Sequence, residues 1–237
     1  EKAVSKSKQF PFRFYSAYQE ISQLVDVSRE YKGKVLHALE IAIYLSVKNI
    51  PRLSGNTAIL VDVSGSMNFN LSEYSSVSYM DIAALMGAIT DYISDNSLVI
   101  AFASTAEVVS LDKDSGILKN MDKIKHTRVG SATYVEEAME LLEKSEFQPD
   151  RILLFSDMQV YSQYGSDNAS QSIRRYLENH GQPYFYSFDL AGYGTSVQPM
   201  WKKGIFLFSG WSEKMLNYIS MAEKESLDIL EEIKRNY

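Results

Sequence analysis

The sequence predicts an α/β fold, in which a doubly wound, mainly parallel sheet is flanked by helices. Short apolar runs, typical of strands that are buried on both faces, alternate along the chain with segments of helical periodicity. Oxygen-bearing residues directly follow two of these runs, as is expected where parallel strands end at a ligand-binding edge. Helical periodicity also precedes the first strand, so the prediction includes an N-terminal helical stub.

The first 52 residues are predicted to be a helical segment. A helix is expected to begin at Pro11, because proline suits the first turn and apolar residues then recur at spacings of three and four. A second helix is expected over 34–48, and Pro51 then turns the chain toward the first strand. We therefore predict two parts, a helical segment over residues 1–52 and an α/β domain over residues 53–237.

The elements of the α/β domain follow from the same patterns. Apolar runs predict strands at 58–62, 98–103, 151–156, 184–188 and 205–208, with a short edge strand at 107–111. Helical spacing predicts helices at 79–94, 114–125, 134–144, 169–179 and 212–234. The small residues of the 79–94 helix predict that this helix lies close to the sheet.

Composition narrows the class of protein. The chain has no cysteine, which excludes disulfides and thiolate metal sites and favours an intracellular, cytoplasmic setting. No apolar run approaches the roughly 18–20 residues that span a membrane, so no membrane partner is expected. Residues 1–60 carry nine basic and five acidic side chains, whereas the rest carries fifteen and twenty-five. A nucleic-acid surface is therefore expected in the first segment. Because the chain begins with Glu1, we expect a fragment or a processed product.

A candidate metal site follows the first strand, in the run Asp62-Val63-Ser64-Gly65-Ser66. Its carboxylate and two hydroxyls can converge beyond the sheet edge, and they are hard oxygen ligands that favour Mg²⁺, Mn²⁺ or Ca²⁺ over zinc. Asp157 directly follows another buried strand and is expected at the same edge. On its own, Asp62 is equally well explained as a turn-forming residue, and Asp157 as a loop residue or helix N-cap.

The run Asp62–Met67 resembles the first motif of the metal-ion-dependent adhesion site (MIDAS) of von Willebrand factor A (vWA) domains. The resemblance extends to Thr133 in the loop Gly130-Ser131-Ala132-Thr133, although Thr133 could also be a helix N-cap. It implies a site with an open coordination position for a carboxylate from a protein ligand. The expected cation is Mg²⁺, with Mn²⁺ or Ca²⁺ as alternatives, held by Asp62, Ser64, Ser66, Thr133 and Asp157. Two departures are a loop that is one residue longer than usual, and Ser156-Asp157-Met158 in place of Thr-Asp-Gly.

The flanking segments are similar to those of TROVE proteins, the Ro autoantigen family. The helix Lys34–Asn49 just before the MIDAS strand resembles their domain junction, and Pro11–Tyr18, Asp189–Thr195 and Phe208–Trp211 resemble other parts. The resemblance implies a bacterial or phage Ro-like ribonucleoprotein. Residues 1–52 would end a helical-repeat module that binds Y or misfolded noncoding RNA, and residues 53–237 would be a vWA domain.

Two other functions remain open on the sequence. A vWA module can serve as a scaffold for protein–protein interaction without any role in RNA binding. A metal-dependent enzyme is a weaker alternative, because Ser64 lacks both a G-x-S-x-G elbow and a nearby histidine. The resemblance favours a binding module that is not an enzyme.

Overall fold

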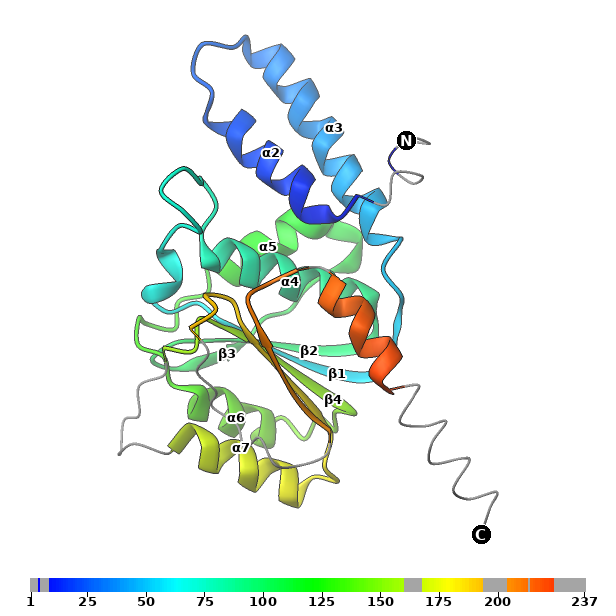
Figure 1. Ribbon diagram of the computed structural model, residues 1–237, viewed down its shortest axis with the longest axis vertical. Coiled ribbons are helices and arrows are strands. Elements are labelled where there is room, and N and C mark those ends of the chain that lie inside the picture. The colour runs from blue at the N-terminus through cyan, green and yellow to red at the C-terminus, as the bar shows by residue number, and fades with distance from the viewer. Residues whose placement is uncertain (1–3, 5–8, 160–167, 194–203, 213, 224–237) are drawn as a thin grey trace.

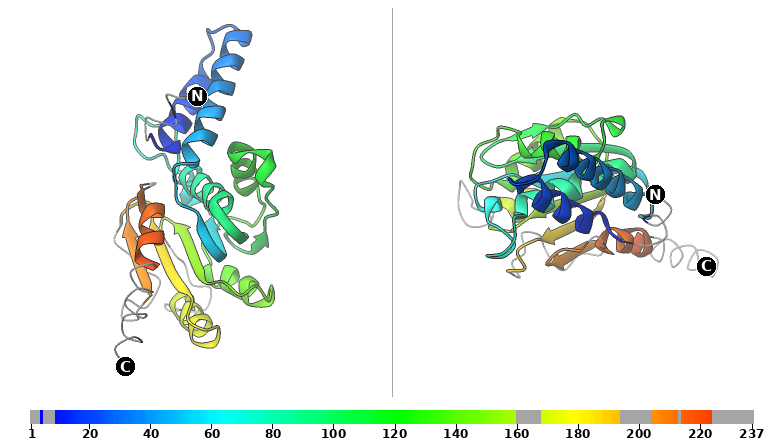
Figure 2. Two further views of the ribbon diagram at one scale, coloured as in Figure 1. Left: turned by 90° about the vertical axis from the view of Figure 1, so that its right-hand side faces the viewer. Right: turned by 90° about the horizontal axis from the view of Figure 1, so that it is seen from above.

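The computed structural model has an α/β body from which a helical hairpin projects (Figures 1 and 2). The hairpin consists of α2 (Pro11–Gln23) and α3 (Arg29–Val47), which precede the first strand. The predicted fold class is confirmed. The structure describes residue 4 and residues 9–159, 168–193, 204–212 and 214–223.

A six-stranded sheet forms the centre of the body. The strands are β1 (Leu53–Asp62), β2 (Ser94–Phe102), β3 (Ala106–Val108), β4 (Arg151–Ser156), β5 (Tyr184–Asp189) and β6 (Ile205–Ser209). Their order is β3-β2-β1-β4-β5-β6, and all neighbours are parallel except β2 and β3. The chain leaves β1 toward β2 and later returns to its other side with β4, so the order reverses beside β1. Ligands bind at the carboxyl ends of strands at such a switch point.

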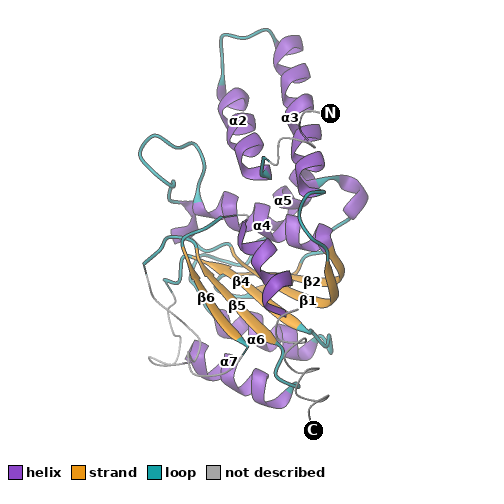
Figure 3. Ribbon diagram, turned by 45° about the vertical axis from the view of Figure 1, so that its right-hand side comes forward, coloured by secondary structure: helices purple, strands orange, loops and turns teal. Residues whose placement is uncertain are grey.

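Helices cover both faces of the sheet (Figures 1 and 3). One face carries α4 (Tyr79–Ile93) and α5 (Ile117–Lys125), and the other carries α6 (Val135–Lys144) and α7 (Asn168–Asn179). Because strand side chains alternate between faces, β1 contributes to two separate cores. Ile59 and Val61 pack in the core with α4 and α5, whereas Ala58 and Leu60 pack in the core with α6 and α7.

Close packing of α4 against the sheet explains its small residues. A Cβ atom added at Gly87 would lie 2.9 Å from Cγ2 of Val61, so no larger residue fits without movement. The prediction that this helix approaches the sheet closely is therefore confirmed. The helix begins with a capping box, in which Ser78 and Asp81 satisfy each other's backbone amides.

Some boundaries differ from the predictions because local capping decides where helices begin. The second helix of the hairpin starts at Arg29, not at residue 34, since the Ser28 hydroxyl accepts a bond from the amide of Tyr31. The helix predicted from residue 114 starts at Ile117, because a short 3₁₀ turn capped by Asp112 precedes it. The edge strand β3 is shorter than predicted, and β1 begins earlier. Residues 214–223 are helical and residue 212 is not, whereas residues 213 and 224–234 of the predicted 212–234 helix lie outside the described residues.

The division of the chain at residue 52 stays a prediction, because the hairpin also contacts the α/β body. Among the described helices, none has the length and apolar character that crossing a membrane requires.

Candidate metal centre

Asp62 is the last residue of β1 and is completely buried. The amide of Ser64 donates a hydrogen bond to its Oδ1 at 2.9 Å, and the hydroxyl of Ser156 donates to its Oδ2 at 2.6 Å. One bond to each oxygen holds the carboxylate in a single orientation.

The two serines of the first motif lie together beside this carboxylate. Ser64 Oγ and Ser66 Oγ are 3.3 Å apart, and Ser64 is fully buried. A 3₁₀ turn, Ser66–Asn68, follows, and the buried side chain of Met67 anchors it in the core. The structure therefore gathers the carboxylate and both hydroxyls that the sequence predicted at this strand end.

The loop 130–133 reaches the first motif through its backbone. The amide of Gly65 donates to the carbonyl of Ser131 at 2.9 Å. The Ser104 hydroxyl, at the end of β2, accepts bonds from the amides of Ser131 and Ala132, both at 3.0 Å. Gly130 has a φ of 91°, and a Cβ atom there would lie 2.5 Å from the Ser104 side chain, so only glycine fits.

Thr133 is buried in this loop, with 1% of its surface exposed. It does not cap the following helix, because the N-cap position of α6 is Tyr134. The alternative interpretation of Thr133 as an N-cap is therefore wrong. The contact that ties the loop to the first motif is made by the Ser131 backbone.

Asp157 directly follows β4 and is also buried, with 1% exposed. Its Oδ1 accepts a bond from the amide of Gln159 at 3.1 Å, and the amide of Met158 donates to Ser156 Oγ at 3.0 Å. Met158 stands where vWA domains usually have glycine, and its φ of 58° explains that preference. The left-handed conformation costs a non-glycine residue roughly 1–2 kcal/mol, a strain that the surrounding bonds maintain.

Electrostatics at Asp62 favours a bound cation. Burial raises the pKa of its carboxyl to about 6, although hydrogen bonds from Ser156 and Ser64 act in the opposite direction. The negative charge of Asp157 adds to the increase, so the two carboxylates lie close enough to interact. A divalent cation would compensate both charges, and the donors are all hard oxygens. The residues therefore fit a hard divalent cation.

Three polar residues at or near this edge of the sheet were not predicted as site residues. Ser156 orients Asp62, and Ser104 holds the Ser131 loop. Asp189 ends β5, is fully buried, and pairs in register with Ser156; its Oδ1 accepts a bond from Gly192 N at 3.0 Å. The sequence signal that could have identified them is a polar residue at or just after the end of each apolar run. In the described ranges, no three His, Cys, Asp or Glu side chains form a metal-binding cluster.

The strand order, the switch point beside β1 and the oxygen-rich carboxyl edge define a protein of the vWA class. A family model described as the Ro60 vWA domain matches residues 57–186. That match spans more than half of the chain. The chain therefore belongs to the Ro60 vWA domain family, which confirms the predicted relation to the Ro family.

A solved structure shares this fold. The Ro (RSR) protein of Deinococcus radiodurans superimposes with a TM-score of 0.72 at 16% identity, over 93% of this chain and 45% of that one. The chain thus spans about half the length of that relative. An aerotolerance-related membrane protein from Bacteroides fragilis has a TM-score of 0.48 at 15% identity, over 72% and 98% of the two chains.

Proximal thread matrix protein 1 from the mussel byssus, with a zinc-occupied MIDAS motif, has a TM-score of 0.43 at 14% identity, over 79% of this chain and 51% of that one. Among curated proteins, none matches the sequence.

Proposed function

We propose that this chain is a metal-dependent ligand-binding module of a Ro-like RNA-binding protein. The observation that supports it best is the gathering of Asp62, Ser64 and Ser66 at the switch point, with the charge of Asp157 acting on Asp62. A cation bound there would supply a positive centre with an open position for a carboxylate ligand.

Each residue of the candidate site would have its own role in holding the cation. Asp62 and Asp157 supply the two negative charges, and Ser64, Ser66 and Thr133 add neutral oxygens, so a divalent cation keeps its attraction for a further anion. Ser156 keeps the Asp62 carboxylate oriented. We expect Mg²⁺, with Mn²⁺ or Ca²⁺ as alternatives, and we infer that the site binds a protein ligand without catalysing a reaction.

Calorimetric titration with Mg²⁺ and Mn²⁺ tests the site. Asp62→Ala should lose most of the affinity, because it removes one of two negative charges. Asp95→Ala is the matched control, since the Asp95 side chain is 55% exposed and lies in a surface ion pair with Arg52. Equal binding by wild type and Asp62→Ala would leave Asp62 as a turn residue.

The proposed RNA role rests on family membership and on the charge of the helical segment. Several basic side chains of the hairpin are exposed, among them Arg13, Arg29 and Lys34. We propose that this part of the chain contributes to binding Y or misfolded noncoding RNA, through salt-sensitive phosphate contacts.

A mobility-shift titration with a misfolded structured RNA tests this role. Replacing Arg13, Arg29 and Lys34 by Glu should weaken binding and reduce its dependence on salt concentration. The control replaces Lys119 and Lys123, exposed on α5, by Glu. If neither variant changes binding, or if the wild-type chain binds no RNA, the chain acts as a protein-binding vWA scaffold.

A further inference from the structure

One helix of the hairpin contacts the segment that carries the candidate metal site. We call residues 66–78 the site loop, because it begins with the proposed ligand Ser66 and ends at the N-cap of α4. The loop lies beside α2 in Figures 1 and 3. Near the C-terminal end of the loop, the Ser76 hydroxyl donates a hydrogen bond to Glu20 Oε1 of α2 at 2.7 Å. This is a direct link between the hairpin and the site loop.

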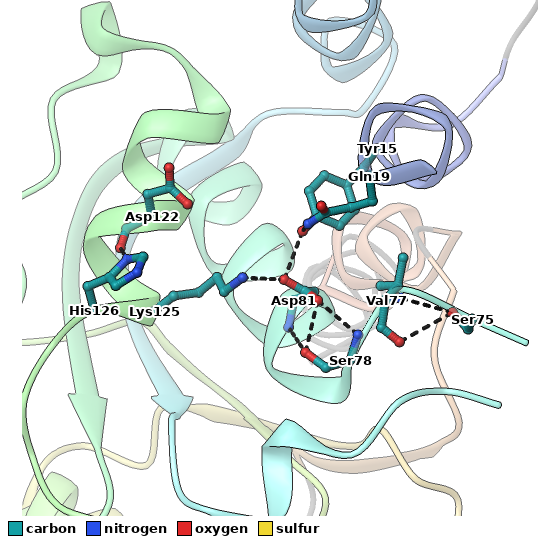
Figure 4. Close-up of polar contacts among 9 residues, drawn as sticks. All are labelled: Tyr15, Gln19, Ser75, Val77, Ser78, Asp81, Asp122, Lys125 and His126. Carbon is teal, nitrogen blue, oxygen red and sulfur yellow. Dashed lines mark hydrogen bonds and ion pairs between the residues drawn. The ribbon is translucent and has the colours of Figure 1, made fainter. Parts of the chain in front are cut away.

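A second link joins α2 to the end of the site loop (Figure 4). The hydroxyl of Tyr15, a side chain with 2% of its surface exposed, donates to Asp81 Oδ1 at 2.8 Å. Asp81 Oδ2 in turn accepts bonds from the amide of Ser78 at 2.8 Å and from its hydroxyl at 2.9 Å. Asp81 therefore connects α2 with the last residue of the site loop.

The charges at this link favour a strong, oriented contact. Burial alone would raise the pKa of the Asp81 carboxyl, but hydrogen bonds from Lys125 and from the Ser78 amide outweigh it and lower that pKa. Burial and the Asp81 charge hold the pKa of Tyr15 well above its usual value. At neutral pH a neutral phenol thus donates to a carboxylate, and such charge-assisted bonds are about twice as strong as neutral ones.

A third contact places α2 at the same edge of the sheet. The rings of Phe12 and Trp211 pack edge to face with centroids 4.1 Å apart, and Trp211 closely follows β6. Along α2, therefore, Phe12, Tyr15 and Glu20 all contact segments that lie at the carboxyl edge of the strands, where the candidate metal site is.

We propose that α2 is a positioning element of the candidate metal site, in which Tyr15 and Glu20 hold the site loop so that Ser66 stays beside Ser64 and Asp62. This inference rests on the proposed metal-binding function. Ordering a loop costs conformational entropy, and α2 supplies that order before a cation binds. Docking of α2 and binding of a cation therefore favour each other, and the coupling is reciprocal.

The first test measures Mn²⁺ affinity by calorimetry in the whole chain. Tyr15→Phe removes only the hydroxyl, and Ser76→Ala removes only the exposed link to Glu20. Each should weaken Mn²⁺ binding about three- to tenfold, which is the change expected for the loss of one hydrogen bond. Tyr176→Phe is the matched control, because Tyr176 is also 2% exposed, its hydroxyl donates to the carbonyl of Phe147, and it lies on α7 across the sheet. Its Mn²⁺ affinity should equal that of wild type.

The second test is hydrogen exchange, which measures order in the site loop without metal. The amides of Leu71 and Tyr79 bond to carbonyls at the two sides of the loop, Val77 and Phe69. They should exchange faster in metal-free Tyr15→Phe than in wild type or Tyr176→Phe. Reciprocally, Mn²⁺ should slow exchange in α2 of wild type.

The outcomes separate this inference from the proposed function. If wild type binds Mn²⁺ and both Tyr15→Phe and Ser76→Ala bind it equally well, the positioning role is refuted and the metal site stands. If Tyr176→Phe weakens binding as much as Tyr15→Phe, the effect reflects general stability, and the positioning role is again refuted. If wild type binds no Mn²⁺, the proposed function and the positioning role fail together.

Discussion

Replacing Asp62 by Asn should stabilise the metal-free protein, although it should also abolish metal binding. The Asp62 carboxylate is completely buried, and burial raises its pKa to about 6 from an ordinary value of 3.8. Asparagine has nearly the same shape and resembles the neutral, protonated carboxyl. The substitution therefore removes the cost of a buried charge and changes little in packing.

The shift of the Asp62 pKa gives the size of the expected stabilisation. About two pKa units, at roughly 1.4 kcal/mol each, correspond to about 3 kcal/mol in the free energy of unfolding. The folded-state pKa lies above the unfolded one, so the native wild type binds an extra proton between about pH 4 and pH 6. The advantage of Asp62→Asn is therefore full above pH 6, shrinks as the pH falls, and vanishes near pH 4.

Urea denaturation in the presence of a chelator, at pH 7.5 and at pH 4.5, measures this difference. Asp95→Asn is the control, because Asp95 is exposed and its replacement should change stability by less than about 0.5 kcal/mol at either pH. The reasoning is refuted if Asp62→Asn is less stable than wild type at pH 7.5, or if the difference does not shrink at pH 4.5. Replacing the chelator by Mn²⁺ should then stabilise wild type and Asp95→Asn but not Asp62→Asn.

Four further predictions concern stability. Arg151→Met should lower the free energy of unfolding in urea by about 3 kcal/mol, because the half-buried carboxylate of Glu223 loses the arginine that donates two hydrogen bonds to it. Adding Glu223→Leu should restore most of the lost stability. Asp81→Asn should cost about 1–3 kcal/mol at pH 7. Because the folded-state pKa of Asp81 is lowered, the wild-type advantage should be full above its unfolded pKa and disappear as the pH falls through the folded one. In thermal melts, Gly87→Leu should destabilise by about 1–3 kcal/mol, since even a Cβ there meets Val61. Gly33→Ala, in an exposed part of α3 where a Cβ meets nothing within 4 Å, should stabilise by about 0.5–1 kcal/mol.

The predictions that succeeded rested on local signals. Apolar runs predicted β1, β4 and β5 because strands buried on both faces need uninterrupted apolar side chains. The small residues of α4 predicted its close approach to the sheet. Asp62 and Asp157 were predicted at one edge because the carboxyl ends of parallel strands meet there, and the structure brings both to that edge. Where a helix starts depends on one or two capping bonds, and the starts of α3 and α5 were accordingly misplaced.

By itself, then, the sequence determined the fold class and the family, and it predicted the candidate residues for a hard cation, since these depend on apolar periodicity and on residue types next to strand ends. Only the tertiary structure decided which distant groups support the site. The bond from Ser156 to Asp62 joins residues 94 positions apart, and the bond from Tyr15 to Asp81 joins residues 66 positions apart. Such pairs follow from strand order and helix docking, which bring together side chains that no local pattern relates.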